Sequence, residues 1–127
     1  MLENHAVATD KAPTPTGPFS QAIRAGGFVF TSGQAGRNRE TGQLGDARDQ
    51  MKWALRNIAA ILEAAGSSMD RVVKVTLYLK DGVDPAAVNE EYRAHFGEPL
   101  PARASVFVSR LKSPEMLVEI EVVATSA

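Results

Sequence analysis

Two charged residues near the end of the chain have types and surroundings suited to chemistry on a small anion. Arg103 adjoins an alternating apolar segment, and its planar guanidinium suits a carboxylate; alternation places it on one face with Ser105 and Phe107. Glu119 lies in the last alternating segment, on one face with Glu121. Two acids so close repel each other, so one can form an interface ion pair while the other works. By pattern alone, a structural cross-strand ion pair remains an alternative to catalysis.

Other polar residues point less clearly to chemistry. His5 and His95 have no second ligand at a metal-like spacing, so we expect no metal site. Asn89 is either a site residue or a solvent-facing amide. The stretch from Ser32 to Gly36 is rich in small residues, which let backbone approach a ligand or another chain closely, but it also fits a plain loop. The glycines lack the spacing of nucleotide-binding loops, so we expect no cofactor.

Composition narrows the class of protein. The 127 residues fit one domain (1–127), and 44% hydrophobic and 23% charged content is typical of a soluble globular protein. The absence of cysteine excludes disulfides, thiolate metal sites and cysteine nucleophiles. A net charge of -1 provides no pull toward nucleic acid, and no apolar run nears the roughly 20 residues of a membrane span. No secretory signal is readable, so we expect a cytoplasmic protein without nucleic-acid or membrane partners.

Two helices have recognisable ends. Apolar residues recur at three-and-four spacing between Asp46, which can cap the first turn, and Gly66, which can end the helix. Asp84 followed by Pro85 starts a second, shorter helix that Gly97 closes.

Strands are indicated by period-two alternation. A hairpin is predicted from Ser20 to Thr31 around Gly26 and Gly27. A long strand spans Val72 to Lys80, with Val73, Val75, Leu77 and Leu79 on the buried face. Two more are predicted, from Ala104 to Val108 and from Leu117 to Ala124, with Lys112, Ser113 and Pro114 in the turn between them.

This order predicts an α+β domain with two helices on one face of a mixed sheet. The other face combines polar and apolar side chains, too polar for a sealed core and too apolar for open water. A subunit interface that contains sites would reconcile the two. We assign to this face the following residues: Lys74, Thr76, Tyr78, Ser105, Phe107, Glu119 and Glu121.

Five segments in this order resemble the successive motifs of the RidA (YjgF) family, and the resemblance covers nearly the whole chain. Each segment alone is only weakly specific for the family, while five segments in the family's order and spacing are a strong indication of it. They are Gly17-Pro18-Phe19-Ser20-Gln21-Ala22, Thr31-Ser32-Gly33-Gln34, Val88-Asn89-Glu90-Glu91-Tyr92, Pro101-Ala102-Arg103-Ala104-Ser105-Val106 and Val118-Glu119-Ile120-Glu121-Val122.

The resemblance implies a chorismate-mutase-like fold and a homotrimer whose sheets enclose a barrel, with three sites between subunits. It implies that Arg103 binds the substrate carboxylate and that Glu119 handles the attacking water. Ser32, Gly33 and Asn89 would line the substrate pocket.

Two positions depart from the family's pattern. Phe19 stands where the family usually has tyrosine, which removes a hydroxyl but keeps a stacking surface, and Ser105 stands where cysteine is common. Both are expected at the substrate site, and we expect the loss of the hydroxyl at Phe19 to affect substrate range or rate.

The resemblance therefore implies hydrolysis of 2-imino or 2-enamino acids, such as 2-iminobutanoate and 2-iminopropanoate, to 2-oxo acids and ammonia, without a cofactor. Alternatives are deamination of another substrate, such as aminoacrylate or 2-aminomuconate, and a non-catalytic carboxylate-binding or chaperone-like trimer. Ribonuclease activity is also attached to some members, but near-neutral charge and the lack of a basic, aromatic stripe disfavour strong RNA binding.

Overall fold

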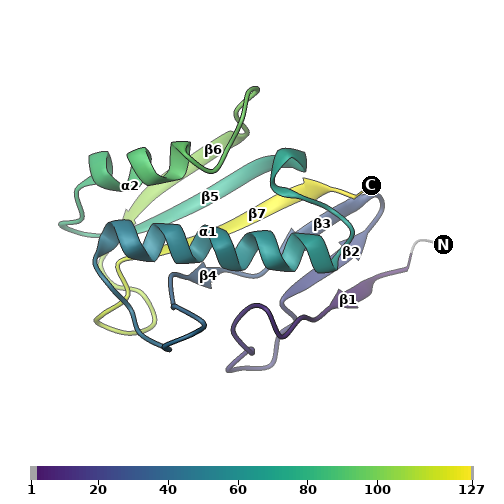
Figure 1. Cartoon of the computed structure of the whole chain (residues 1–127), viewed down its shortest axis with the longest axis horizontal. Coiled ribbons are helices and arrows are strands. Elements are labelled where there is room, and N and C mark those ends of the chain that lie inside the picture. Colours follow the sequence, from purple (N-terminus) through teal and green to yellow (C-terminus); the bar gives the residue numbers. More distant parts are fainter. Residues whose placement is uncertain (1–2, 127) are drawn as a thin grey trace.

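A single mixed sheet with two helices on one face makes up the fold (Figure 1). The computed structural model describes residues 3–126. Its strands and helices are β1 (His5–Val7), β2 (Ala22–Ala25), β3 (Phe28–Thr31), β4 (Gln34–Ala35), α1 (Ala47–Ala64), the 3-10 turn η1 (Met69–Arg71), β5 (Val72–Lys80), α2 (Pro85–Arg93), β6 (Ala102–Val108) and β7 (Val118–Thr125).

The strands pair in the order β1-β2-β3-β7-β5-β6, and the short β4 also pairs with β7. All neighbours are antiparallel except β5 and β6, which run parallel because α2 carries the chain back between them. The α+β class and the mixed sheet with two helices are thereby confirmed. The trimeric barrel stays a prediction.

The predicted hairpin is formed by β2 and β3. Gly26 and Gly27 have φ of 58° and 81°, the positive angles of a tight two-residue turn whose twist suits antiparallel strands. Ala25 pairs directly with Phe28 across this turn.

The two predicted helices are confirmed, with small shifts at their ends. The Asp46 carboxylate accepts a hydrogen bond from Asp49 N at 2.9 Å, and Gly66 with φ of 80° follows the last turn of α1. Asp84 caps α2 in the same way through Ala86 N at 3.0 Å. The shorter helix ends at Arg93, four residues before Gly97. No helix among residues 3–126 is long and apolar enough to cross a membrane.

One buried residue of β5 was predicted wrongly. Val73 is 43% exposed, whereas Val72 is buried, because the pairing of β5 with β7 shifts register between Val72 and Lys74. A bulge adds one residue to a strand and so restarts the alternation. From Val75 onward, the alternation follows the prediction.

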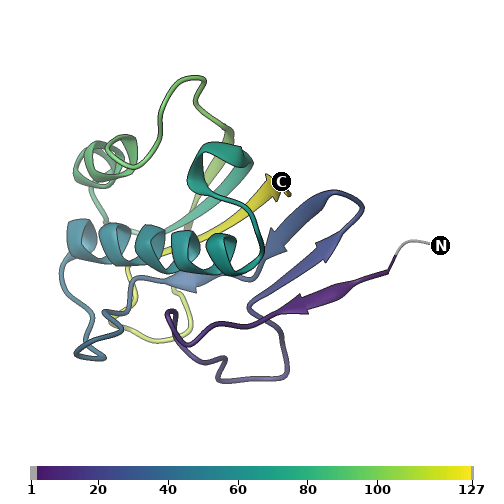
Figure 2. The same ribbon diagram turned by 45° about the vertical axis from the view of Figure 1, so that its right-hand side comes forward.

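The face of the sheet under α1 and α2 is the hydrophobic core (Figure 2). Fully buried side chains of α1 pack there against β7, β4 and β3, and alternate residues of β5 belong to the same buried cluster. The opposite face has no covering element in the described chain, and its residues from β3, β5, β6 and β7 include Phe28, Phe30, Tyr78, Val106, Glu119 and Glu121.

Candidate active site

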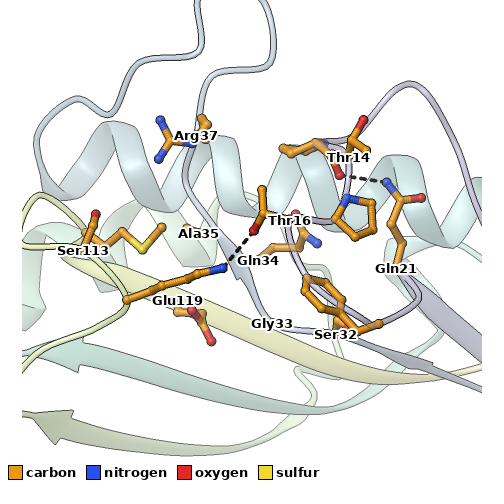
Figure 3. Close-up of a pocket in the computed structure, with 15 residues that line it drawn as sticks. Thr14, Thr16, Gln21, Ser32, Gly33, Gln34, Ala35, Arg37, Ser113 and Glu119 are labelled. Atoms are coloured by element: carbon orange, nitrogen blue, oxygen red, sulfur yellow. Dashed lines mark hydrogen bonds between the residues drawn. The ribbon is translucent and has the colours of Figure 1, made fainter.

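A cavity of about 810 Å³ lies beside the N-terminal half of β7 (Figure 3). Its walls come from three regions far apart in sequence: the arm before β2, the segment after β3, and the turn that leads into β7. The lining residues are Pro13, Thr14, Pro15, Thr16, Phe19, Gln21, Ser32, Gly33, Gln34, Ala35, Arg37, Lys112, Ser113, Met116 and Glu119.

The buried amide of Gln21 holds the N-terminal arm against the sheet. Its Oε1 accepts from Thr9 N at 2.7 Å, and its Nε2 donates to the carbonyls of Thr9 at 3.1 Å and Pro13 at 2.9 Å. Since a buried amide left without partners is costly, these three bonds fix the wall of the cavity that Pro13 begins.

A second buried amide, Gln50 in α1, holds the turn before β7. Its Nε2 donates to the carbonyls of Gly45 and Glu115 at 2.8 and 2.9 Å, and its Oε1 accepts from Leu117 N at 2.7 Å. The chain approaches this position closely, because a Cβ on Gly36 would lie 1.9 Å from the Gln50 carbonyl oxygen. Only glycine fits at position 36 without moving backbone.

Ser32 and Gly33 form the wall next to Glu119. The Ser32 hydroxyl donates to the Ser20 carbonyl at 2.6 Å, and the Ser32 N–H donates to the Gln21 carbonyl at 2.9 Å. Gly33 lies against the Glu119 carboxyl group, since a Cβ there would be 2.4 Å from Glu119 Oε2. The missing side chain at position 33 is what leaves room for the carboxyl group.

The Glu119 carboxyl group is partly buried beside the second acid of its strand. Burial, and then the negative charge of Glu121, raise the pKa of Glu119, while the ammonium of Lys112 opposes this rise. Glu121 itself accepts a hydrogen bond from the Tyr78 hydroxyl. A carboxyl group with a raised pKa can both accept and return a proton nearer to neutral pH.

Arg103 lies outside this cavity. Its Nη1 donates to Asn89 Oδ1 at 2.8 Å, and its guanidinium carbon lies 4.8 Å from the ring centre of Tyr92. Asn89 and Tyr92 are three residues apart on α2, so they share one face of the helix. The Tyr92 ring in turn contacts Phe96, with ring centres 4.6 Å apart. These contacts hold an exposed cation over an aromatic support.

The structure corrects the predicted placement of β6. Arg103 pairs with Val75 and Ser105 with Leu77, both buried on the helix side, so Arg103, Ser105 and Phe107 belong to the helix-side face. Alternation indicates which residues of a strand share a face but not which face that is. Here, parallel pairing with β5 decides it. Arg103 also lies within β6 rather than before it.

Arg103 and Glu119 are therefore separated within one chain. Glu119 pairs with Tyr78 on the uncovered face of the sheet, while Arg103 is level with Val75 and, beyond it, Val122. The two residues are about 10 Å apart along the strand direction, which is three residues of β7, and about 10 Å apart across the sheet, which is two strand spacings. The sheet itself lies between the two side chains. One protomer thus holds two partial sites.

The predicted site residues divide between these partial sites. Four of them line the cavity: Phe19, Ser32, Gly33 and Glu119. Asn89 and Arg103 bond to each other, and Ser105 follows on the same strand face. Among residues 3–126, no three His, Asp or Glu side chains gather as a metal site.

Several lining residues were missed in the sequence. Lys112 was recognised only as part of a turn, and Arg37, Gln21 and Thr16 were not singled out for the site. A basic side chain in the turn just before the glutamate strand was the available signal for Lys112. The other three are brought to the cavity by long-range packing.

Comparisons with known proteins agree along almost the whole chain. The family model described as endoribonuclease L-PSP matches residues 9–126. A RutC family protein of Pyrococcus abyssi is 49% identical over 97% of this chain and 98% of its own length. The 2-iminobutanoate/2-iminopropanoate deaminase of Mus musculus is 42% identical over 93% of this chain and 88% of its own length. The crystal structure of Escherichia coli TdcF with bound serine has a TM-score of 0.88 at 35% identity and covers 97% of this chain and 99% of that chain.

Proposed function

The chain belongs to the endoribonuclease L-PSP family, which is also the YjgF/RidA family, and from that premise we propose that it is an imine and enamine deaminase. Its substrates are 2-imino acids, and its products are 2-oxo acids and ammonia. Two relatives, at 38% and 42% identity, are named 2-iminobutanoate/2-iminopropanoate deaminase. The observation that carries the proposal is the partly buried carboxyl group of Glu119, which lies against Gly33 in a cavity large enough for a small organic acid.

The reaction asks for a placed water molecule and controlled proton transfer. A protonated imine is already electrophilic at C2. Glu119 accepts a proton from water as the water oxygen bonds to C2, and the amine of the resulting adduct then receives a proton. As the C–N bond breaks and ammonia leaves, the C2 hydroxyl gives its remaining proton to Glu119 and becomes the carbonyl of the 2-oxo acid. That proton then passes to the released ammonia, which leaves as ammonium. The raised pKa of Glu119 suits both directions of this proton transfer.

Substrate binding in this proposal uses Arg103 from a second copy of the chain. A guanidinium binds a carboxylate through two parallel hydrogen bonds, but the Arg103 of the same protomer lies on the wrong face of the sheet for the Glu119 cavity. Since Arg103 is exposed on the edge strand β6, a neighbouring subunit can receive it.

A homotrimer provides the second copy. The uncovered face of the sheet exposes 42% of Phe28, 46% of Phe30 and 45% of Val106, and burying such side chains is a main driving force of association. In a closed ring of three, each subunit gives its Arg103 to one neighbour and receives an arginine at its own cavity.

RNA fits this cavity less well than a 2-imino acid does, although the family model carries the name endoribonuclease. The net charge is -1, and the three charged side chains of the cavity are Arg37, Lys112 and Glu119. A nucleic-acid site needs a continuous basic surface that neutralises several phosphates.

The test is ammonia release from 2-iminobutanoate that an amino-acid oxidase generates in the same vessel, with mixed subunits as the second step. At substrate concentrations below the KM of the parent protein, Arg103→Ala and Glu119→Gln should each be weakly active or inactive, and the two variants are then co-expressed and assayed under the same conditions. If each site combines two subunits, about a quarter of the sites in random trimers contain both original residues, and activity returns to that extent.

Failure takes distinct forms. Absence of ammonia release by the unmodified protein contradicts the enzyme itself, and stabilisation by 2-oxo acids without turnover would favour a binding protein. Activity without recovery in mixed trimers contradicts the shared site. Elution as a monomer in size exclusion with light scattering contradicts the trimer.

A further inference from the structure

A lysine that the proposed reaction does not use projects into the cavity. Lys112 Nζ donates to Thr16 Oγ1 at 2.8 Å, and Figure 3 marks this bond by the dashed line that ends at the labelled Thr16. The bond joins the turn before β7 to the N-terminal arm across the cavity. The ammonium is close enough to Glu119 to lower the pKa of that carboxyl group, so the two charges face the same space.

Lys112 forms no salt bridge within the described residues. Among residues 3–126, no carboxylate oxygen lies within 4.0 Å of its ammonium, and its partner Thr16 is a neutral hydroxyl. An ammonium has three donors, and only one is engaged here. The other cation of the lining, Arg37, donates to the Gly42 carbonyl at 2.6 Å.

A second donor in the same wall is also unused. The hydroxyl oxygen of Ser113, the residue after Lys112, is buried and has no hydrogen-bond partner within the part of the chain that the structure describes. Buried polar atoms normally have a partner, so this orphaned hydroxyl, in the residue next to a lysine with unused donors, favours a polar ligand at this wall.

The reacting end of a 2-imino acid leaves this wall unoccupied. In the proposed function, Glu119 acts at C2 and Arg103 of a neighbouring subunit binds the carboxylate next to C2. A cavity of about 810 Å³ has room beyond these groups for a side chain. The two cations of the lining, Arg37 and Lys112, outnumber its one carboxylate, Glu119, so the net charge of the cavity favours an acidic side chain.

We propose that Lys112 binds a second acidic group of the substrate, so that the enzyme prefers 2-imino acids with a carboxylate on the side chain. Oxidation of aspartate or glutamate at the amino-bearing carbon produces this class of compound. The inference rests on the proposed function and specifies its substrate class. Binding makes and breaks no covalent bond at Lys112, and the hydrolysis proceeds through the steps given under the proposed function.

The kinetic test compares 2-iminosuccinate, made in place by an aspartate oxidase, with 2-iminobutanoate, made by an amino-acid oxidase. The readout is the kcat/KM for 2-iminosuccinate divided by the kcat/KM for 2-iminobutanoate. In Lys112→Met, we expect this ratio to fall about tenfold or more, the effect of one lost hydrogen bond between charged groups. Lys112→Arg keeps the charge and should retain most of the preference.

A matched control removes a lysine outside the cavity. Lys52 lies on α1 and its ammonium is 4.0 Å from Asp49, so Lys52→Met lowers the net charge equally without touching the lining. It should leave the ratio as it is. An equal fall in Lys52→Met would mean that overall charge sets the preference, and an unchanged ratio in Lys112→Met would overturn the proposal.

A binding experiment separates this inference from the proposed function. Calorimetry with 2-oxoglutarate and 2-oxobutanoate compares a diacid with a monoacid that share the same 2-oxo acid end and need no turnover. Tighter binding of the diacid that is lost in Lys112→Met supports the acidic-group site even if no imine is hydrolysed. Equal loss for both ligands would assign Lys112 to the shared carboxylate and overturn the proposal.

Discussion

The cavity around Glu119 and the cluster around Arg103 hold their charged groups in different ways. Glu119 is partly buried, and the walls around it are braced by the internal amides of Gln21 and Gln50. Arg103 is exposed on an edge strand, and Asn89 and the Tyr92 ring are its contacts. Burial raises the pKa of a carboxyl group, and a raised pKa helps the group both to accept and to return a proton. An anion-binding guanidinium stays charged without burial and can meet another chain.

The largest effect should come from the cavity. Glu119→Gln keeps the size of the side chain but removes proton transfer, and we expect kcat to fall about 100- to 10,000-fold. The melting temperature should change little. The measurement is ammonia release from 2-iminobutanoate, with the exposed Glu63→Gln of α1 as the control. Parent activity in Glu119→Gln would remove the carboxyl group from the mechanism.

The arginine cluster should respond in a different kinetic constant. Arg103→Ala removes the proposed carboxylate donor, and we expect KM to rise about 10- to 100-fold with a smaller change in kcat. Initial rates over a range of 2-iminobutanoate concentrations separate the two constants. A fall in kcat at constant KM would contradict the division of labour between the two regions.

Gly33→Ala sharpens the description of the cavity. The added Cβ would lie 2.4 Å from Glu119 Oε2 and so displace the carboxyl group, which should lower kcat about tenfold, since small misplacements of reacting groups are costly. Gly97→Ala is the matched control, because a Cβ there meets nothing within 4 Å. Equal kinetics for both variants would show that the position of the Glu119 carboxyl group is not critical.

The smallest effect concerns the support of Arg103. Tyr92→Phe keeps the ring under the guanidinium and removes a buried hydroxyl that has no partner in the described chain, so kinetics should stay near the parent values. Tyr92→Leu removes the aromatic face, and KM should rise about two- to fivefold, the size of an exposed cation–π contact. Identical KM values in the two variants would show that the ring does not position Arg103.

Much of the local structure could be predicted because short-range interactions determine it. Asp46 and Asp84 cap helices through backbone groups two or three residues away. The turn at Gly26 and Gly27 depends only on the positive φ angles that these two glycines adopt. The strands β1 and β4, with three and two residues, are too short to show alternation and were missed. The bulge at Val73 depends on the partner strand, so the alternation of β5 alone could not predict it.

The sequence by itself determined the helix ends, the hairpin, the α+β class, and the alternation that groups Arg103 with Ser105 and Glu119 with Glu121. Only the tertiary structure decided which side of the sheet each group occupies, since the pairing of β5 with β6 and β7 sets that choice over long range. It also brought Lys112 to the wall opposite Thr16, 96 positions earlier in the chain. Capping and alternation act over a few residues, whereas cavities and faces arise from contacts between distant segments, and so local patterns could not specify them.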